Sequence, residues 1–324
     1  MTQKHGSNIS LIYTKETTAY QRNASFPSEN TQNCDQLYGE KLTETKAPHA
    51  VDWDDKKATG QYLGKMLRQA QSAIYGDEVV RCSTELSLQK ATSPNGERWR
   101  VRPFSTCKRR WCPVCEWKKS RERLLYALSN WSKLVPDPDA VRVRFLTLTV
   151  KNCTPEEVAD TVGHVLQSFR KLLHHKTQIT KNWLGYIRTL ELTHNPETGM
   201  MHPHMHIIFL TPKNDPRAET SEWVQAWRKA AKLGYDPVCD IRAVKSLEKG
   251  LAEVLKYTTK PAKIANDAVT LALAIAALKG RRLQQAGGCL KGIFEPVENE
   301  PLEWQNAGNF DWRAVEKIYR RRLF

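Results

Sequence analysis

Three of the nine histidines fall within five residues, at His202, His204 and His206, directly before the apolar run 207–210. That run has the β-branched and aromatic content of a strand. Side chains two positions apart on a strand share a face, so His204 and His206 would stand roughly 7 Å apart and could hold one divalent ion. A histidine pair at this spacing can also be a buried core pair or a surface coincidence, so the motif needs a second feature beside it.

A second segment, residues 247–261, places a tyrosine on an expected helix whose apolar positions follow the spacing of a buried stripe. Glu253 and Tyr257 are four residues apart and would project from one face of that helix. Lys256 and Lys260 flank the tyrosine. A helical tyrosine is commonly core or interface filler, but beside a metal site its oxygen can act as a nucleophile.

The net charge of the chain favours a polyanionic partner. Its 324 residues carry 50 lysines and arginines against 35 acidic residues, a net charge of +15. Nucleic acid fits this balance better than a membrane surface. The longest apolar run, residues 268–278, is far shorter than the ~20 residues of a spanning helix, and no secretory signal is visible at the N-terminus. We therefore expect a cytoplasmic protein with no membrane partner.

Four of the eight cysteines, Cys82, Cys107, Cys112 and Cys115, form a pattern that ends in a tight Cys-x-x-Cys pair. Thiolates at such spacing can surround a tetrahedral zinc ion, with Cys82 as the fourth ligand from an upstream turn. The alternatives are a redox pair or plain buried thiols. A redox pair usually opens a helix after a strand in a thioredoxin-like pattern, which this segment lacks.

Basic and aromatic residues alternate around the cysteines. Trp99, Trp111 and Trp117 lie among them, an arrangement that suits phosphate contacts and base stacking. The alternative is a solvated helix face above core tryptophans. The candidate DNA-binding residues are Arg109, Arg110, Lys118, Lys119 and Arg121.

The order of expected elements after residue 140 is strand, helix, strand, strand, helix, strand, helix. This order predicts an α+β fold, an antiparallel sheet with helices packed on it in a ferredoxin-like arrangement. The expected ranges are strand 141–150, helix 155–176, strand 183–193, a turn at 195–199 followed by the histidine strand, helix 221–232, strand 238–243 and helix 247–261.

The expected hairpin supplies a third candidate ligand, Glu191, near the end of the strand that pairs with the histidine strand. His202 and His194 compete for the role, but the proline after His202 makes that residue part of the strand's entry. Two imidazoles and a carboxylate leave open positions for substrate oxygens and suit Mg²⁺ or Mn²⁺, although histidines also suit zinc.

Three ordered motifs, residues 145–152, 202–206 and 253–260, together resemble those of plasmid rolling-circle replication initiators, the single-tyrosine branch of the HUH endonucleases. The stretch 107–115 resembles the cysteine-rich segment that precedes the first motif in that branch. The resemblance implies an HUH-type nuclease domain at 140–262 behind a cysteine-rich, basic DNA-binding module at 56–132. Outside it, we expect a mostly disordered polar tail at 1–55 and a helical basic C-terminal segment at 263–324.

The resemblance also implies roles for single residues. His204 and His206 would bind the catalytic metal, Tyr257 would attack DNA, and Glu253 would assist water attack at termination. From the chemistry alone, either Lys256 or Lys260 could steady the phosphate charge or the tyrosinate, with a solvated surface lysine as the alternative for Lys256. Asn152 and the threonines of the first motif would support the geometry. Cutting would leave a 5′-phosphotyrosine and a 3′ hydroxyl that primes synthesis. Origin DNA, a host helicase, a DNA polymerase and a homodimeric or larger assembly are the implied partners, with Mg²⁺ or Mn²⁺ at the nuclease site and a structural Zn²⁺.

Other functions remain open from the sequence. A related single-tyrosine transposase or relaxase would use the same chemistry. A non-catalytic, zinc-dependent DNA-binding regulator would explain the charge and the cysteines but leave the histidine and tyrosine motifs without a role. A metal-dependent hydrolase of small phosphoesters would not need Tyr257.

Overall fold

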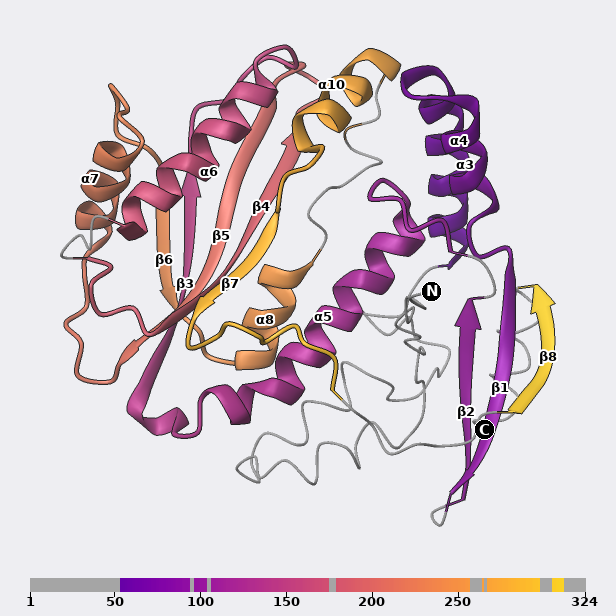
Figure 1. Cartoon of the computed structure of the whole chain (residues 1–324). Helices are drawn as coiled ribbons and strands as arrows, with labels where there is room; N and C mark the ends of the chain where they lie inside the picture. Colours follow the sequence, from indigo (N-terminus) through magenta and orange to yellow (C-terminus); the bar gives the residue numbers. More distant parts are fainter. Residues whose placement is uncertain are drawn as a thin grey trace, which may run out of the picture. The chain divides into compact units, whose positions relative to one another are not determined.

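The computed structural model describes residues 53–93, 96–103, 106–174, 179–256, 264, 267–297 and 305–311 (Figure 1). The chain divides into two compact units. Among the described residues, the first unit contains 53–60, most of 78–118 and 305–311, and the second contains 61–77 and most of 119–297. Three helices run from one unit into the other: α3 (Trp53–Ala70), α4 (Ala73–Arg81) and α5 (Pro113–Leu134). Residue 132, the expected end of the cysteine-rich module, lies inside α5.

The first unit contains a three-stranded antiparallel sheet in the order β2-β1-β8. Its strands are β1 (Glu85–Ser93), β2 (Gly96–Pro103) and β8 (Gln305–Asp311). Leu86 of β1 pairs with Pro103 on one side and Phe310 on the other. The expectation of a helical C-terminal segment is wrong at β8, because a strand from much earlier in the chain supplies its backbone partners.

The second unit is built on a five-stranded antiparallel sheet in the order β6-β3-β5-β4-β7, which confirms the predicted α+β class. Two crossover helices, α6 (Val158–His174) and α7 (Thr220–Ala230), connect its first four strands in a ferredoxin-like order. A short 3₁₀ helix, η1 (Pro138–Ala140), precedes the sheet. The strands are β3 (Val141–Thr149), β4 (Gly185–His194), β5 (Met201–Pro212), β6 (Cys239–Ala243) and β7 (Gln284–Gly288).

Strand β7 is a second correction to the helical C-terminal segment. Its sequence, two glutamines, an alanine and two glycines, has low strand propensity. It pairs with β4, from Thr189 opposite Gln284 to Gly185 opposite Gly288. The guanidinium of Arg188, 4% exposed, donates to the carbonyls of Arg282 and Leu283 just before β7. Tertiary contacts of this kind hold the edge strand.

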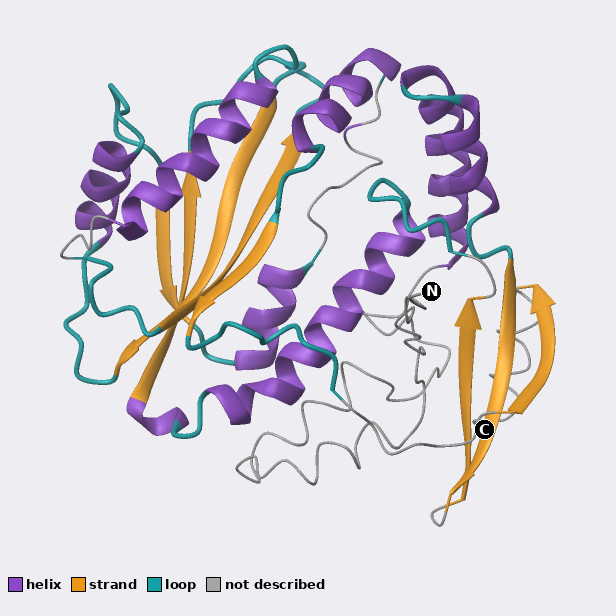
Figure 2. Ribbon diagram, viewed as in Figure 1, coloured by secondary structure: helices purple, strands orange, loops and turns teal. Residues whose placement is uncertain are grey.

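Helices cover both faces of the central sheet (Figure 2). Helices α6, α7 and α10 (Ala268–Leu278) pack on one face. Helices α5 and α8 (Leu247–Leu255) pack on the other, where Trp131, Ile208 and Leu251 belong to one buried cluster. The longest apolar run of the sequence forms α10 and lies against α6. Within the described part of the chain, no helix is both long and apolar enough to cross a membrane.

Helix α8 is shorter than the sequence predicted. Ser246 caps its start by accepting a hydrogen bond from the backbone N–H of Lys249. Its last helical residue is Leu255, because Lys256 has an extended ψ of 179°. The carbonyl of Leu255 accepts a hydrogen bond from Ser120 Oγ at 2.7 Å. In a longer helix a backbone N–H of the next turn would donate to this carbonyl, and here Ser120 takes that place. The predicted continuation to residue 261 is therefore wrong at Lys256, and residues 257–263 lie outside the described residues.

Candidate metal centre

The β4–β5 hairpin brings Glu191, His204 and His206 together. Glu191 is the register partner of His204, and His206 follows two positions later on the same face. Glu191 Oε2 lies 3.3 Å from His206 Nε2 and 3.6 Å from His204 Nε2. One potential ligand atom from each residue lies within 4.8 Å of the other two. The register of one antiparallel pair thus forms the three-donor group that the sequence suggested.

Hydrogen bonds on the other ring nitrogens orient both imidazoles. His204 Nδ1 donates to the backbone carbonyl of His202 at 3.1 Å. A carbonyl can only accept, so in the neutral ring the free lone pair is on Nε2, the atom that faces Glu191. His206 Nδ1 lies 3.1 Å from Thr147 Oγ1, on the neighbouring strand β3. Both rings therefore turn Nε2 toward the carboxylate.

The chemistry of the three donors fits a divalent cation. Glu191 is 2% exposed, whereas the side chains of His204 and His206 are 12% and 13% exposed. A buried carboxylate requires a compensating positive charge, which either a protonated imidazole or a cation can supply. Nitrogen and oxygen donors converge from one side only, so further coordination positions stay available for substrate oxygens.

The two competing histidines are placed differently. His202 Nδ1 interacts with Asn152 Oδ1 at 2.7 Å, and its ring stacks on that of His204 with centroids 4.9 Å apart. Burial, followed by the neighbouring charge of His204, lowers the pKa of His202. His194 pairs with Met201 at the turn of the hairpin, three positions from Glu191. Neither joins the three-donor group.

The end of helix α8 lies beside the histidines. Thr189, the register partner of His206, donates from Oγ1 to the carbonyl of Val254 in the last turn of α8. Glu253 in that turn forms a half-exposed ion pair with Lys256. Tyr257 and Lys260 lie outside the described residues. Helix α8 thus ends beside the strand position that pairs with His206, and Leu255, its last residue, is two residues before Tyr257.

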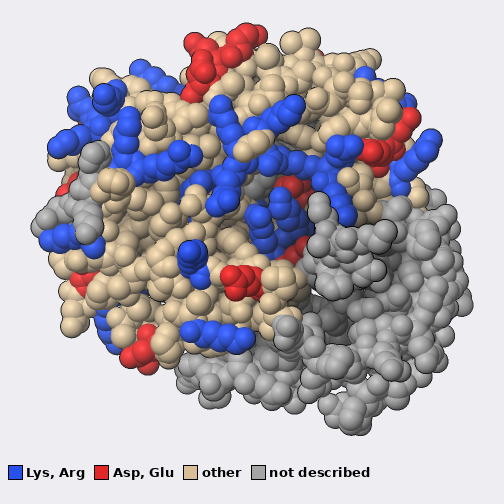
Figure 3. Space-filling model, in the orientation of Figure 1, with Lys and Arg blue, Asp and Glu red and all other residues tan. Residues whose placement is uncertain are grey.

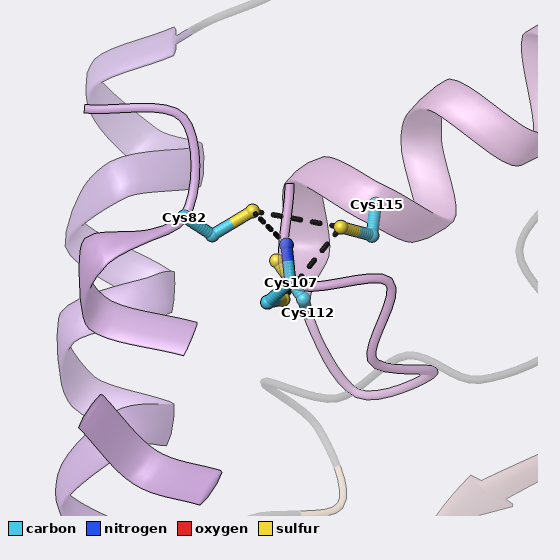
Figure 4. A group of neighbouring side chains, drawn as sticks. All are labelled: Cys82, Cys107, Cys112 and Cys115. Atoms are coloured by element: carbon cyan, nitrogen blue, oxygen red, sulfur yellow. Dashed lines mark hydrogen bonds between the residues drawn. The ribbon is translucent and has the colours of Figure 1, made fainter. Parts of the chain in front are cut away.

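The first unit contains the cysteine group (Figure 4). Cys82 follows α4, Cys107 and Cys112 lie on the loop before α5, and Cys115 lies in the first turn of α5. Cys115 Sγ is 3.5 Å from Cys82 Sγ and 3.7 Å from Cys107 Sγ. Four sulfurs at ~2.3 Å around tetrahedral zinc would be about 3.8 Å apart. All four cysteines are free, and hydrogen bonds from the other three thiols lower the pKa of Cys82.

The candidate DNA-binding residues differ in their surroundings. Arg109 forms an ion pair with Glu78 at 2.5 Å, and this hydrogen bond lowers the pKa of Glu78. Lys119 is exposed, and Arg110, Lys118 and Arg121 are partly exposed. Lys and Arg cover more of the drawn face in Figure 3 than Asp and Glu.

The tryptophans of that segment do not match the expected stacking role. Trp111 and Trp117 are 2% and 5% exposed, so they are core residues and their rings are closed to bases. The side chain of Trp99 lies outside what the structure describes.

Two residues that support the histidine end of β3 were missed by the sequence analysis. Trp227 Nε1 of α7 donates to the carbonyl of Thr149 at 2.7 Å. Tyr235 Oη accepts from the backbone N–H of Lys151 at 2.8 Å. Trp227 lies in α7 and Tyr235 in the connection from α7 to β6, both far from β3 in sequence, and no local pattern indicates such contacts.

Comparison with known proteins gives one consistent result. The family model described as "Replication protein" matches residues 98–316. A "Protein rep" of Lactiplantibacillus plantarum is 32% identical over 282 residues, which cover 78% of this chain and 87% of the relative. A "Protein rep" of Streptococcus pneumoniae serotype 2 is 31% identical over 229 residues, 65% of this chain and 71% of the relative. One of Bacillus amyloliquefaciens is 29% identical over 286 residues, 76% and 82% of the two chains. No solved structure matches the chain.

Proposed function

The chain belongs to the Replication protein family, and from this premise we propose that it initiates rolling-circle replication of a plasmid by nicking one strand at the origin. The observation that carries the proposal is the convergence of Glu191, His204 and His206 on one sheet face beside the end of α8. Such a site can hold a phosphodiester next to a nucleophile from the segment that follows α8.

The proposed nucleophile is Tyr257. Its phenolic oxygen bonds to the scissile phosphorus as the bond from phosphorus to the 3′ oxygen breaks. The phenolic proton passes to solvent, and the departing oxygen takes up a proton to become the 3′ hydroxyl. The phosphate stays on the tyrosine as the 5′ end of the cut strand, so the phosphoester bond energy is kept for a later strand transfer.

We assign Glu191, His204 and His206 as ligands of Mg²⁺ or Mn²⁺. Bound there, the cation would polarise the phosphoryl oxygens and offset developing negative charge. The chain's own contribution is orientation: the carbonyl of His202 and the hydroxyl of Thr147 hold the two imidazoles. Lys260 is assigned to steady the phosphate charge near the tyrosine.

Glu253 is the proposed base for the second cut, at termination. Its carboxylate would take a proton from water, which then attacks phosphorus and yields a hydrolysed end instead of a second covalent adduct. Its ion pair with Lys256 holds the carboxylate in the last turn of α8, close to where Tyr257 follows in the chain.

The remaining parts have supporting roles in this proposal. The cysteines would bind a structural Zn²⁺. The module at 56–132, with Arg109, Arg110, Lys118, Lys119 and Arg121, would contact origin DNA ahead of the nuclease domain at 140–262. A host helicase and a DNA polymerase would then use the opened strand and its 3′ hydroxyl.

Cleavage of labelled single-stranded origin DNA in Mn²⁺ tests the proposal on a denaturing gel that retains protein–DNA adducts. We expect an adduct from the wild type and from the control variant Tyr62→Phe, in which an exposed tyrosine is replaced, and none from Tyr257→Phe. Equal cutting without an adduct would favour a metal-dependent hydrolase. DNA binding with no cutting by any of the three proteins would favour a regulator. A transposase or relaxase would instead join the cut strand to DNA from outside the plasmid origin.

A further inference from the structure

Three arginines lie at the end of the central sheet where β3 begins and β5 ends, away from the histidines. Arg142 and Arg144 are two positions apart on β3 and share one face. Arg144 is the register partner of Phe209, whose ring lies 5.5 Å from that of Trp223 on α7, so this is the face that α7 covers. Arg217 lies in the connection from β5 to α7.

Arg144 is a buried arginine of β3. It is 7% exposed, and among the residues that the structure describes none accepts a hydrogen bond from its guanidinium or forms an ion pair with it. Burial, followed by the charge of Arg142, lowers the pKa of Arg144, and Arg217 acts in the same direction. A buried guanidinium among like charges is costly unless an anion accompanies it.

The neighbouring polar groups are hydrogen-bond donors that are not used within the described part of the chain. Thr211 is the register partner of Arg142, and its buried Oγ1 has no partner there. The buried Nε1 atoms of Trp183 and Trp223 likewise have none. Thr211 and the two tryptophans, which pack against Phe209, share the sheet face that carries Arg144. Buried donors of this kind usually have an acceptor, so three of them on this face indicate a ligand that supplies acceptor oxygens.

The carboxylate of Asp215 does not balance these charges. Asp215 is the carboxylate whose charge acts on Arg144. Its Oδ1 already accepts from Asn182 at 2.5 Å, and its backbone carbonyl accepts from Arg142 at 3.1 Å. Arg142 thus binds the backbone of Asp215 and not its carboxylate, and the carboxylate has another donor.

We propose that Arg142, Arg144 and Arg217 form a binding site for a phosphate group, separate from the histidine centre. Arg144 is five positions along β3 from Thr149, the register partner of His204, and its side chain is on the opposite face. At strand rise the two sites are roughly 17 Å apart along β3. The phosphate belongs either to the DNA backbone or to a free phosphate or nucleotide. The first of these sources rests on the proposed function.

The test uses the full-length chain with Arg217→Gln and Arg142→Gln, which change exposed arginines, and Lys229→Gln as a control for loss of one exposed charge on α7. Affinity for labelled single-stranded DNA is measured by anisotropy over a series of salt concentrations. If the source is DNA, each arginine variant lowers the slope of log affinity against log salt by about 0.7, the value for one lost phosphate contact. For the control Lys229→Gln, the slope of log affinity against log salt stays steeper than for either arginine variant.

A second arm uses inorganic phosphate alone, against chloride at equal ionic strength, and follows thermal unfolding. We expect phosphate to stabilise the wild type but not Arg144→Gln, and Arg144→Gln to be at least as stable as the wild type in chloride, because an unpaired buried charge is removed. Stabilisation by phosphate with unchanged DNA slopes would identify the free ligand as the source. If the arginine variants show the same salt slope and the same response of thermal unfolding to phosphate as Lys229→Gln, the proposed phosphate site is wrong. Neither arm depends on strand cleavage, so a wild type that binds and does not nick counts against the proposed function alone.

Discussion

Thr147 and His206 are register partners on adjacent strands, and the threonine Oγ1 lies 3.1 Å from His206 Nδ1. The contact leaves Nε2 as the ring atom that faces Glu191. A threonine of the first sequence motif thereby orients a histidine of the second.

Replacing Thr147 by valine should weaken metal binding while preserving the fold. Valine keeps the shape of the side chain but removes the hydroxyl that holds His206, and loss of such a contact typically lowers metal affinity about 10- to 100-fold. Titration calorimetry with Mn²⁺ measures the affinity, and Thr147→Ser is the matched control that retains the hydroxyl. Equal affinities for the valine variant and the wild type would show that the contact does not orient the ligand.

The end of helix α8 should matter for cleavage more than for metal binding. Ser120 Oγ donates to the carbonyl of Leu255, so Ser120→Ala leaves that group without this donor and should cost about 1 kcal/mol. We expect slower adduct formation with an unchanged Mn²⁺ affinity, because the end of α8, from which the chain continues to Tyr257, is then held less firmly. A parallel loss of metal affinity would place Ser120 in support of the metal site instead.

The cysteine group should bind one zinc ion per chain. Metal analysis of the purified protein should find this ion, and Cys112→Ser should lose it together with several degrees of thermal stability. Cys289→Ser is the control, because Cys289 is exposed and outside the group. A zinc content unchanged in Cys112→Ser would contradict the assignment.

Thiol labelling should separate Cys239 from Cys289 by pH. Burial raises the pKa of Cys239 to about 12. An acid with a raised pKa stays protonated at neutral pH, so at pH 8 about one Cys239 in ten thousand is the reactive thiolate. Mass spectrometry after iodoacetamide treatment at pH 8 should show modified Cys289 and unmodified Cys239. Labelling of Cys239 should require either unfolding or a pH near 12, and rapid labelling of the native protein at pH 8 would show that the strand β6 opens.

The sequence predicted those strands and helices of the second unit whose form follows from the spacing of their own apolar residues. The strand expected at 141–150 forms β3, and the stripe of Val158, Val162 and Phe169 on α6 is buried as its spacing predicts. The grouping of Glu191 with two histidines followed from hairpin register alone. Strands β7 and β8 could not be predicted in this way, because their own residues carry no strand pattern and distant strands supply their partners.

The end of α8 shows the same limit. Its apolar stripe continues past Leu255 in the sequence, but Ser120 and Thr189 bind the last carbonyls from other elements. The burial of Trp111 and Trp117 likewise follows from packing, which a pattern of basic and aromatic residues cannot distinguish from a stacking surface. Local spacing determines which residues share a face, and tertiary contacts determine where an element stops.

The most direct test of the central claim is to identify the residue that becomes covalently attached to DNA. The protein is reacted in Mn²⁺ with a single-stranded origin oligonucleotide, digested with protease and nuclease, and analysed by mass spectrometry. We predict a nucleotide on Tyr257 alone, absent when His204→Ala replaces the wild type or when a chelator removes the metal. An adduct on any other residue, or one that forms equally in His204→Ala, would contradict it.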